Sequence, residues 1–135
     1  MMTKEQYIES LRRLKLNVYF MGEKIENPVD HPMIRPSMNS VAMTYELAEK
    51  EEYQDIMTAT SNLTGKKINR FCHLHQSPED LVKKVKMLRL LGQKTGSCFQ
   101  RCVGMDAFNA IYSTTYEIDK KHGTEYHKRF VESMQ

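Results

Sequence analysis

Cys98 and Cys102 stand four residues apart in the segment Gly96–Gly104. If this segment is helical, the two positions lie on the same face, roughly 6 Å apart along the axis, and both thiols point the same way. Paired thiolates on one wall suit two corners of an iron–sulfur cluster, whose irons are held by cysteine and sometimes by histidine. Two ligands make half a site, so we expect other segments to complete it.

Other interpretations of the cysteines remain open at this point. From spacing alone, two cysteines on a helix are more often small buried packing residues, because free cysteine is among the most buried residue types. Cys72, His73 and His75 form a second group that could suggest zinc. Structural zinc sites show two separated pairs of ligands, and this run lacks that spacing. We therefore expect a partly buried cysteine beside surface histidines there.

Composition limits the class of protein. The chain has 135 residues, of which 40% are hydrophobic and 27% charged, so it is large enough for one domain with a single core. Its net charge of +3 comes from 20 basic and 17 acidic residues with interspersed signs, which argues against a nucleic-acid partner. We find no apolar run of membrane-spanning length and no signal peptide, so we expect a cytoplasmic protein without membrane contact.

The amino-terminal half predicts two helices separated by an irregular segment. Thr3 and Gln6 form a capping box, which predicts a first helix over residues 4–14. Prolines exclude regular helix over residues 27–36. Ser37 is the candidate N-cap of a second helix that runs through residue 48.

Short extended segments are predicted at two places. The apolar, aromatic-rich run 18–21 is typical of a strand or a buried extended segment. Residues 61–65 have the composition of a turn, and the segment 68–74 that follows is ambiguous.

The carboxy-terminal half predicts the longest helices. Ser77 is a strong N-cap because proline follows it at the first helical position and two acids follow the proline. The apolar residues 81, 85, 88 and 91 then repeat at helical spacing until Gly92. A fourth helix over about 95–121 carries the cysteine pair, and a last one covers 124–132. We predict a mainly α fold, a small bundle of four or five helices.

Three blocks of sequence carry a family resemblance. They are residues 29–37, residues 61–71, and above all residues 90–109, which include Cys98-Phe99-Gln100-Arg101-Cys102. Across essentially its whole length, the chain resembles the 4-hydroxybutyryl-CoA dehydratase family. That family belongs to a wider group similar to acyl-CoA dehydrogenases and to the flavin-dependent 4-hydroxyphenylacetate 3-monooxygenases.

The resemblance implies a domain assignment and an activity. Family members are longer, with a helical amino-terminal domain, a β-rich middle domain and a carboxy-terminal helical bundle. Residues 1–135 correspond to the first alone, a single helical domain like that of acyl-CoA dehydrogenase-like enzymes. The implied reaction is dehydration of 4-hydroxybutyryl-CoA to crotonyl-CoA, together with isomerisation of vinylacetyl-CoA, and we expect the isolated chain to be inactive.

The resemblance also implies cofactors and partners. The family uses FAD and a four-iron four-sulfur cluster held by three cysteines and one histidine, and its CxxxC pair matches Cys98 and Cys102. The other two cluster ligands belong to later parts of the family's chain, so we expect this chain alone to retain neither cofactor. The implied partners are a CoA thioester substrate, the remaining domains and further copies in a tetramer.

Four further residues are candidates for the site. Gln100 and Arg101 lie between the cysteines and could support the cluster ligands by hydrogen bonds or contact CoA. A surface salt bridge is an equally good interpretation of Arg101. Met105 lies one turn beyond Cys102 and could line the cluster pocket. Arg35, between two prolines, could reach a phosphate or carboxylate, although a contact to a loop carbonyl is favoured.

Two alternative functions stay open. The oxygenase component of a flavin-dependent aromatic monooxygenase would share the architecture, but it has no need of the cysteine pair. A non-catalytic helical module for binding or assembly would keep the scaffold without the activity.

Overall fold

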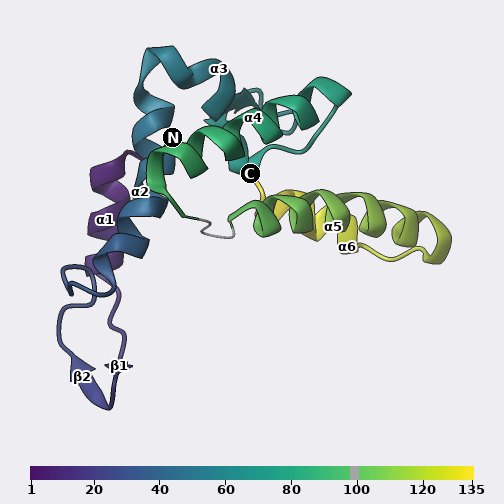
Figure 1. Cartoon of the computed structure of the whole chain (residues 1–135). Helices are drawn as coiled ribbons and strands as arrows, with labels where there is room; N and C mark the ends of the chain where they lie inside the picture. Colours follow the sequence, from purple (N-terminus) through teal and green to yellow (C-terminus); the bar gives the residue numbers. More distant parts are fainter. Residues whose placement is uncertain (98–100) are drawn as a thin grey trace.

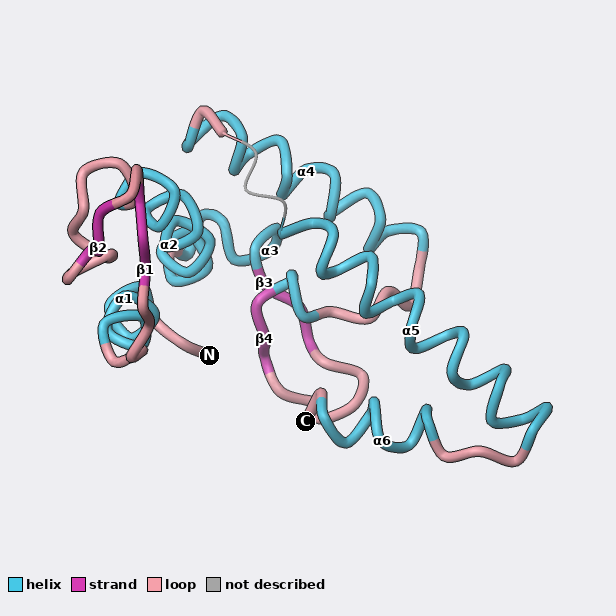
Figure 2. The backbone as a smooth tube through the Cα atoms, turned by 90° about the horizontal axis from the view of Figure 1, so that it is seen from below, coloured by secondary structure: helices cyan, strands magenta, loops and turns pink. Residues whose placement is uncertain are grey.

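The computed structural model describes residues 1–97 and 101–135, and most of them are helical (Figures 1 and 2). The α-helices are α1 (Lys4–Arg12), α2 (Arg35–Glu49), α3 (Gln54–Met57), α4 (Pro78–Thr95), α5 (Arg101–His122) and α6 (Tyr126–Ser133). Two short 3-10 helices are η1 (Glu51–Tyr53) and η2 (Arg70–Cys72), and the strands are β1 (Val18–Phe20), β2 (Glu23–Ile25), β3 (Thr58–Thr60) and β4 (Lys67–Asn69). The predicted mainly α class is confirmed.

The first two helices test the capping predictions. The Thr3 side chain caps α1 and Gln6 returns the bond, as predicted, although α1 ends at Arg12. The prediction that Ser37 caps the second helix is wrong, because α2 begins at Arg35 and has no side-chain cap. The predicted exclusion of helix over 27–36 is also wrong at its last two residues. Pro36 occupies the first turn, where its fixed φ is already helical and its missing N–H has no helical acceptor to lose.

The strands form two antiparallel hairpins. Of the two alternatives predicted for residues 18–21, the strand is confirmed over Val18–Phe20 as β1, which pairs with β2. Met21 (φ 53°) and Gly22 (φ 85°) form a two-residue turn with positive φ at both positions, the geometry that suits hairpin twist. This hairpin projects from the body of the molecule beyond α1 and α2 (Figure 1). The predicted turn at 61–65 joins β3 to β4.

The end of α4 differs from the prediction. We expected a break at Gly92 and a new helix from about residue 95. Instead α4 continues through Gly92 and ends at Thr95, where Gly96 adopts a left-handed conformation (φ 63°) that only glycine takes without steric cost. The end near His122–Gly123 is confirmed, and α6 folds back along α5, so that the pair extends as one arm (Figure 1).

The main core lies where α2, α3, η2, α4 and α5 meet. Its buried members are Leu47, Ala48, Met57, Phe71, Met87, Leu91 and Met105. A smaller cluster packs α1 against α2 through Val29, Met38 and Ala42. On α4, Leu91 is buried, but Leu81 and Val85 are 50% and 56% exposed.

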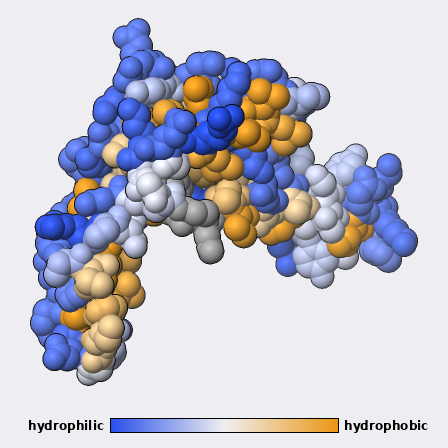
Figure 3. Space-filling view, in the orientation of Figure 1, coloured by the Kyte–Doolittle hydropathy of each residue, from blue (hydrophilic) through white to orange (hydrophobic). Residues whose placement is uncertain are grey.

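The exposed side chains of Leu81 and Val85 give α4 an apolar patch on its outer surface. Figure 3 shows hydrophobic residues gathered over this helix. Within the described ranges, no helix is both long and apolar enough to cross a lipid bilayer.

Candidate functional site

Of the predicted cysteine pair, the structure describes Cys102, at the start of α5. Cys102 lies in the first turn of α5 and is half-buried. Cys98 and Gln100 fall outside the described residues. The predicted pairing of two thiols on one helical face therefore stays a prediction.

Arg101 is held between two aromatic rings. Its guanidinium carbon lies 4.8 Å from the ring centroid of Tyr45 and 4.9 Å from that of Phe71. One guanidinium nitrogen donates to the Tyr45 hydroxyl at 3.1 Å, and another donates to the Thr44 hydroxyl. Such cation–π contacts contribute about 0.5–2 kcal/mol each. Arg101 therefore fixes the start of α5 against α2 and η2 instead of forming a surface salt bridge.

The same stack extends to α1. The ring of Tyr7 stacks on Tyr45 with centroids 4.8 Å apart. Burial raises the pKa of Tyr7, the neighbouring Tyr45 raises it further, and the charge of Arg101 opposes both. Arg101 also borders a cavity of about 390 Å³ that is lined in part by Tyr45 and Cys72.

The inner face of α5 joins the helix to the segment before α4. Cys102, Met105 and Asn109 follow a spacing of three and four, which places them on one stripe of the helix. Met105 is 1% exposed and packs in the main core, and its place beside a cluster stays a prediction. The Asn109 amide oxygen accepts the backbone N–H of His75 at 2.7 Å, and its NH₂ group donates to the carbonyls of His73 at 3.3 Å and Met105 at 2.9 Å.

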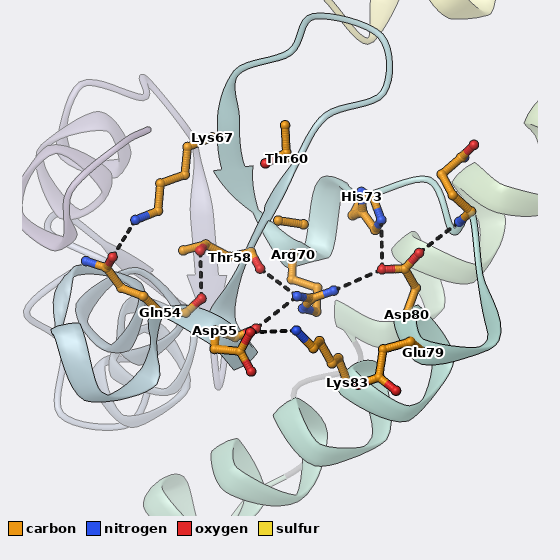
Figure 4. Close-up of a pocket in the computed structure, with 12 residues that line it drawn as sticks. Gln54, Asp55, Thr58, Thr60, Lys67, Arg70, His73, Glu79, Asp80 and Lys83 are labelled. Atoms are coloured by element: carbon orange, nitrogen blue, oxygen red, sulfur yellow. Dashed lines mark hydrogen bonds and ion pairs between the residues drawn. The ribbon is translucent and has the colours of Figure 1, made fainter.

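A cavity of about 520 Å³ lies between α3, the β3–β4 hairpin and α4, with Arg70 on its floor (Figure 4). Arg70 is only 3% exposed. Its side chain donates to the backbone carbonyls of Ile56 at 2.7 Å, Asp55 at 3.0 Å and Thr58 at 2.6 Å. The remaining nitrogen, Nη1, donates to the Asp80 carboxylate at 3.4 Å. Burial lowers the pKa of Arg70, and Asp80 opposes that shift. All three nitrogens of the guanidinium group donate to backbone or carboxylate oxygens, which indicates a structural role for Arg70.

Asp80 joins this network to the start of α4. Its carboxylate lies 3.1 Å from His73 Nε2 and accepts the backbone N–H groups of Gln76 and Ser77 at 2.9 and 3.1 Å (Figure 4). Burial alone would raise the pKa of Asp80, but these hydrogen bonds and the His73 ring lower it to about 2. The carboxylate is therefore ionised near neutral pH. Burial, and next the charge of Lys84, lowers the pKa of His75.

The described residues do not complete a metal site. Across residues 1–97 and 101–135, no three metal-binding side chains converge. The expected partly buried cysteine beside surface histidines is wrong, because Cys72 is exposed whereas His73 is buried and turned toward Asp80. These residues form no zinc centre. Cys102 supplies one half-buried thiol, a donor that fits a single corner of a cluster whose other ligands come from elsewhere. Arg35 lies exposed in the first turn of α2.

Sequence reasoning missed several of these residues. Arg70 is the one arginine or lysine in the ambiguous segment 68–74. A lone cation among apolar residues could have indicated a buried charge with hydrogen-bond partners. Asp80 was recognised for the helix start but not for its contacts with Arg70 and His73. Asn109 carried no local signal, because its partners outside α5 lie 34 and 36 residues away.

Comparison with known proteins places the chain in a family. Residues 3–135 match the family described as 4-hydroxyphenylacetate 3-hydroxylase, N-terminal. The chain belongs to this family.

Within the 4-hydroxyphenylacetate 3-hydroxylase N-terminal family, the chain is similar to dehydratases over nearly its whole length. It is 72% identical over 134 residues to the 4-hydroxybutyryl-CoA dehydratase/vinylacetyl-CoA-Delta-isomerase of Clostridium aminobutyricum, covering 99% of this chain and 27% of that protein. A solved structure of an oxygen-tolerant archaeal 4-hydroxybutyryl-CoA dehydratase from N. maritimus superposes with a TM-score of 0.92 at 59% identity, over 98% of this chain and 26% of that one. The chain thus spans about a quarter of the length of these relatives.

Similarity to the monooxygenases of the family is weaker. The oxygenase component of 4-hydroxyphenylacetate 3-monooxygenase, solved with FAD and 4-hydroxyphenylacetate, gives a TM-score of 0.60 at 26% identity. That match covers 70% of this chain and 19% of the other. The predicted resemblance to both groups is confirmed, and the flavin named with this relative supports a flavoprotein family.

Proposed function

We propose that the chain is the amino-terminal part of a 4-hydroxybutyryl-CoA dehydratase that also isomerises vinylacetyl-CoA. The 72% identity to the Clostridium aminobutyricum enzyme, over 99% of the chain, carries this proposal. It includes a CoA thioester substrate, FAD, an iron–sulfur cluster, the remaining domains of the enzyme and assembly into a tetramer. The product of the dehydration is crotonyl-CoA.

Residues of this chain would contribute two corners of the cluster. Cys102 lies in the first turn of α5 and is half-buried, and its thiol is one proposed ligand. Cys98 is the proposed second ligand. When bound, the cluster supplies a Lewis acid for the departing hydroxyl and FAD supplies one-electron chemistry. Arg101 stacks between Tyr45 and Phe71, so its proposed part is to hold the helix that carries Cys102.

A monooxygenase component is the weaker candidate. The solved oxygenase component of 4-hydroxyphenylacetate 3-monooxygenase is only 26% identical and matches 70% of this chain. A flavin monooxygenase of this kind also has no need of the cysteine pair. Both observations favour the dehydratase.

The decisive experiment measures iron and acid-labile sulfide, with the visible absorption spectrum, in the anaerobically purified full-length enzyme. We expect the unmodified enzyme to hold a full cluster, and Cys98→Ala or Cys102→Ala to lose both the cluster and dehydration, because each removes a thiolate ligand. The matched control is Cys72→Ala, which removes an exposed cysteine outside the proposed ligand set. Normal iron content and turnover in Cys102→Ala would contradict the proposed role of Cys102 as a cluster ligand. The 135-residue chain alone should bind little iron.

A further inference from the structure

Asn109 is the side chain through which α5 is attached to the segment between η2 and α4. We propose that Asn109 is a positioning residue, which sets where α5 presents Cys102. The consequence for the cluster rests on the proposed function, whereas the effect on Cys102 rests on the geometry alone. Asn109 lies in the block 90–109 that carries the family resemblance, and neither the cysteine pair nor the Arg101 stack accounts for it.

The three hydrogen bonds of Asn109 use both ends of its amide. The oxygen accepts the N–H of His75, and the nitrogen donates to the carbonyls of His73 and Met105. Two of these partners belong to a different element from α5, so the amide fixes the helix laterally as well as along its axis. An apolar replacement would leave a part-buried backbone N–H without this acceptor, which is costly.

The anchor itself is rigidly held. The imidazole of His73 meets Asp80 at 3.1 Å, and Asp80 also faces Arg70, the buried residue that binds three backbone carbonyls. The segment 73–75 is thus fixed to α4 on one side and, through Asn109, to α5 on the other. Because Asn109 binds this segment, the position of the segment determines the position of α5.

Cys102 lies between two points of attachment. Arg101 precedes it directly and is stacked between Tyr45 and Phe71. Asn109 follows seven residues later on the same stripe, about 10 Å along the axis. Between them Met105 packs in the main core, and Lys84 of α4 pairs with the exposed Asp106. Apolar packing has no preferred direction, so the hydrogen bonds of Arg101 and Asn109 are the contacts that define the rotation of the helix. Because ligand placement errors of about 1 Å impair a site, the second attachment matters for the thiol.

The test measures how fast Cys102 is alkylated by iodoacetamide in the full-length enzyme after its iron has been removed with a chelator. Peptide mapping by mass spectrometry resolves each cysteine, and the exposed Cys72 serves as the internal reference. We expect Asn109→Ala to raise the Cys102-to-Cys72 rate ratio about fivefold, which corresponds to about 1 kcal/mol in an opening equilibrium. The matched control is Asn39→Ala, at an exposed asparagine of α2, which should leave the ratio unchanged.

Asn109→Asp provides a second readout that a loss of packing alone would not give. The carboxylate keeps the acceptor for His75 but faces two carbonyl oxygens, which favour its protonated form. We expect the rate ratio to be high at pH 8 and to return toward the unmodified value at pH 6, as the acid regains a donor. If Asn109→Ala fails to fold, this pH series decides the proposal.

The outcomes separate this inference from the proposed function. An unchanged ratio in Asn109→Ala, or an Asn109→Asp ratio equal to the unmodified one at both pH values, overturns the positioning role. In the iron-loaded enzyme, Asn109→Ala should also bind less iron than Asn39→Ala. If the unmodified enzyme holds no iron, or if Cys102→Ala retains it, the proposed function fails while the labelling result still stands.

Discussion

At the scale of single residues, the most constrained charge is the one on Arg70. It is almost fully buried, and an unpaired charge there would be strongly destabilising. Three backbone carbonyls and Asp80 share its donors, so it ties α3 and the β3–β4 hairpin to α4. The Asp80 carboxylate also accepts the N–H groups of Gln76 and Ser77, just before α4, which makes its ionised form part of the fold.

The pKa of Asp80 predicts an acid-sensitive contribution to stability. That pKa is about 2 in the folded chain against an ordinary value of 3.8, so the contribution is complete above about pH 4 and is lost as the pH falls toward 2. We expect Asp80→Asn to lower the free energy of unfolding by about 1 kcal/mol at pH 5, and the difference to vanish near pH 2. Urea denaturation of both proteins across this range measures it. A difference that stays constant with pH would contradict the assignment.

At the scale of elements, helix starts show how local signals compete. Ser77 caps α4 through Asp80 in a reciprocal pair of hydrogen bonds, as its sequence indicates. Ser37 also precedes a helical pattern, but no proline or acid directly follows it, and α2 has already begun at Arg35, so that Ser37 lies within its first turn. The difference arises because Pro36 favours the first turn of a helix more strongly than Ser37 favours a cap.

The two serines provide a matched pair for a stability test. Ser77→Ala removes the acceptor for the Asp80 N–H, and we expect it to lower the free energy of unfolding by about 1 kcal/mol. Ser37→Ala removes an exposed hydroxyl from α2 and should change that free energy by less than about 0.5 kcal/mol. Urea denaturation at neutral pH compares them. Equal losses would mean that Ser37 caps α2 after all.

At the scale of the whole molecule, burial is concentrated at the centre. The main core gathers residues from α2, α3, η2, α4 and α5, whereas the β1–β2 hairpin and the outer parts of α5 and α6 extend from it (Figures 1 and 2). In α5, Met105 is buried near the core, while Ile111 and Tyr116 are 42% and 53% exposed. Local stability should therefore fall with distance from the core.

Hydrogen exchange followed by mass spectrometry tests this gradient. We expect the backbone amides around Leu47 and Leu91 to exchange slowest, at rates set by global unfolding. Amides in residues 18–25 and 111–133 should exchange at least about tenfold faster, because local opening exposes little apolar surface there. Uniform protection along the chain would contradict the prediction.

The sequence by itself determined the helical class, the capping of α1 and α4, the first strand and the family, because periodicity, capping residues and motifs are local or contiguous. It did not determine where α4 ends, because the cost of Gly92 inside a helix is small beside the packing of Leu91 in the core. Only the tertiary structure joined Arg70 to Asp80, Arg101 to its two rings and Asn109 to residues 73–75. The contacts of Arg101 and Asn109 link segments far apart in the chain, whereas Arg70 and Asp80 are ten residues apart, and all of them form only when the packed core brings their elements together.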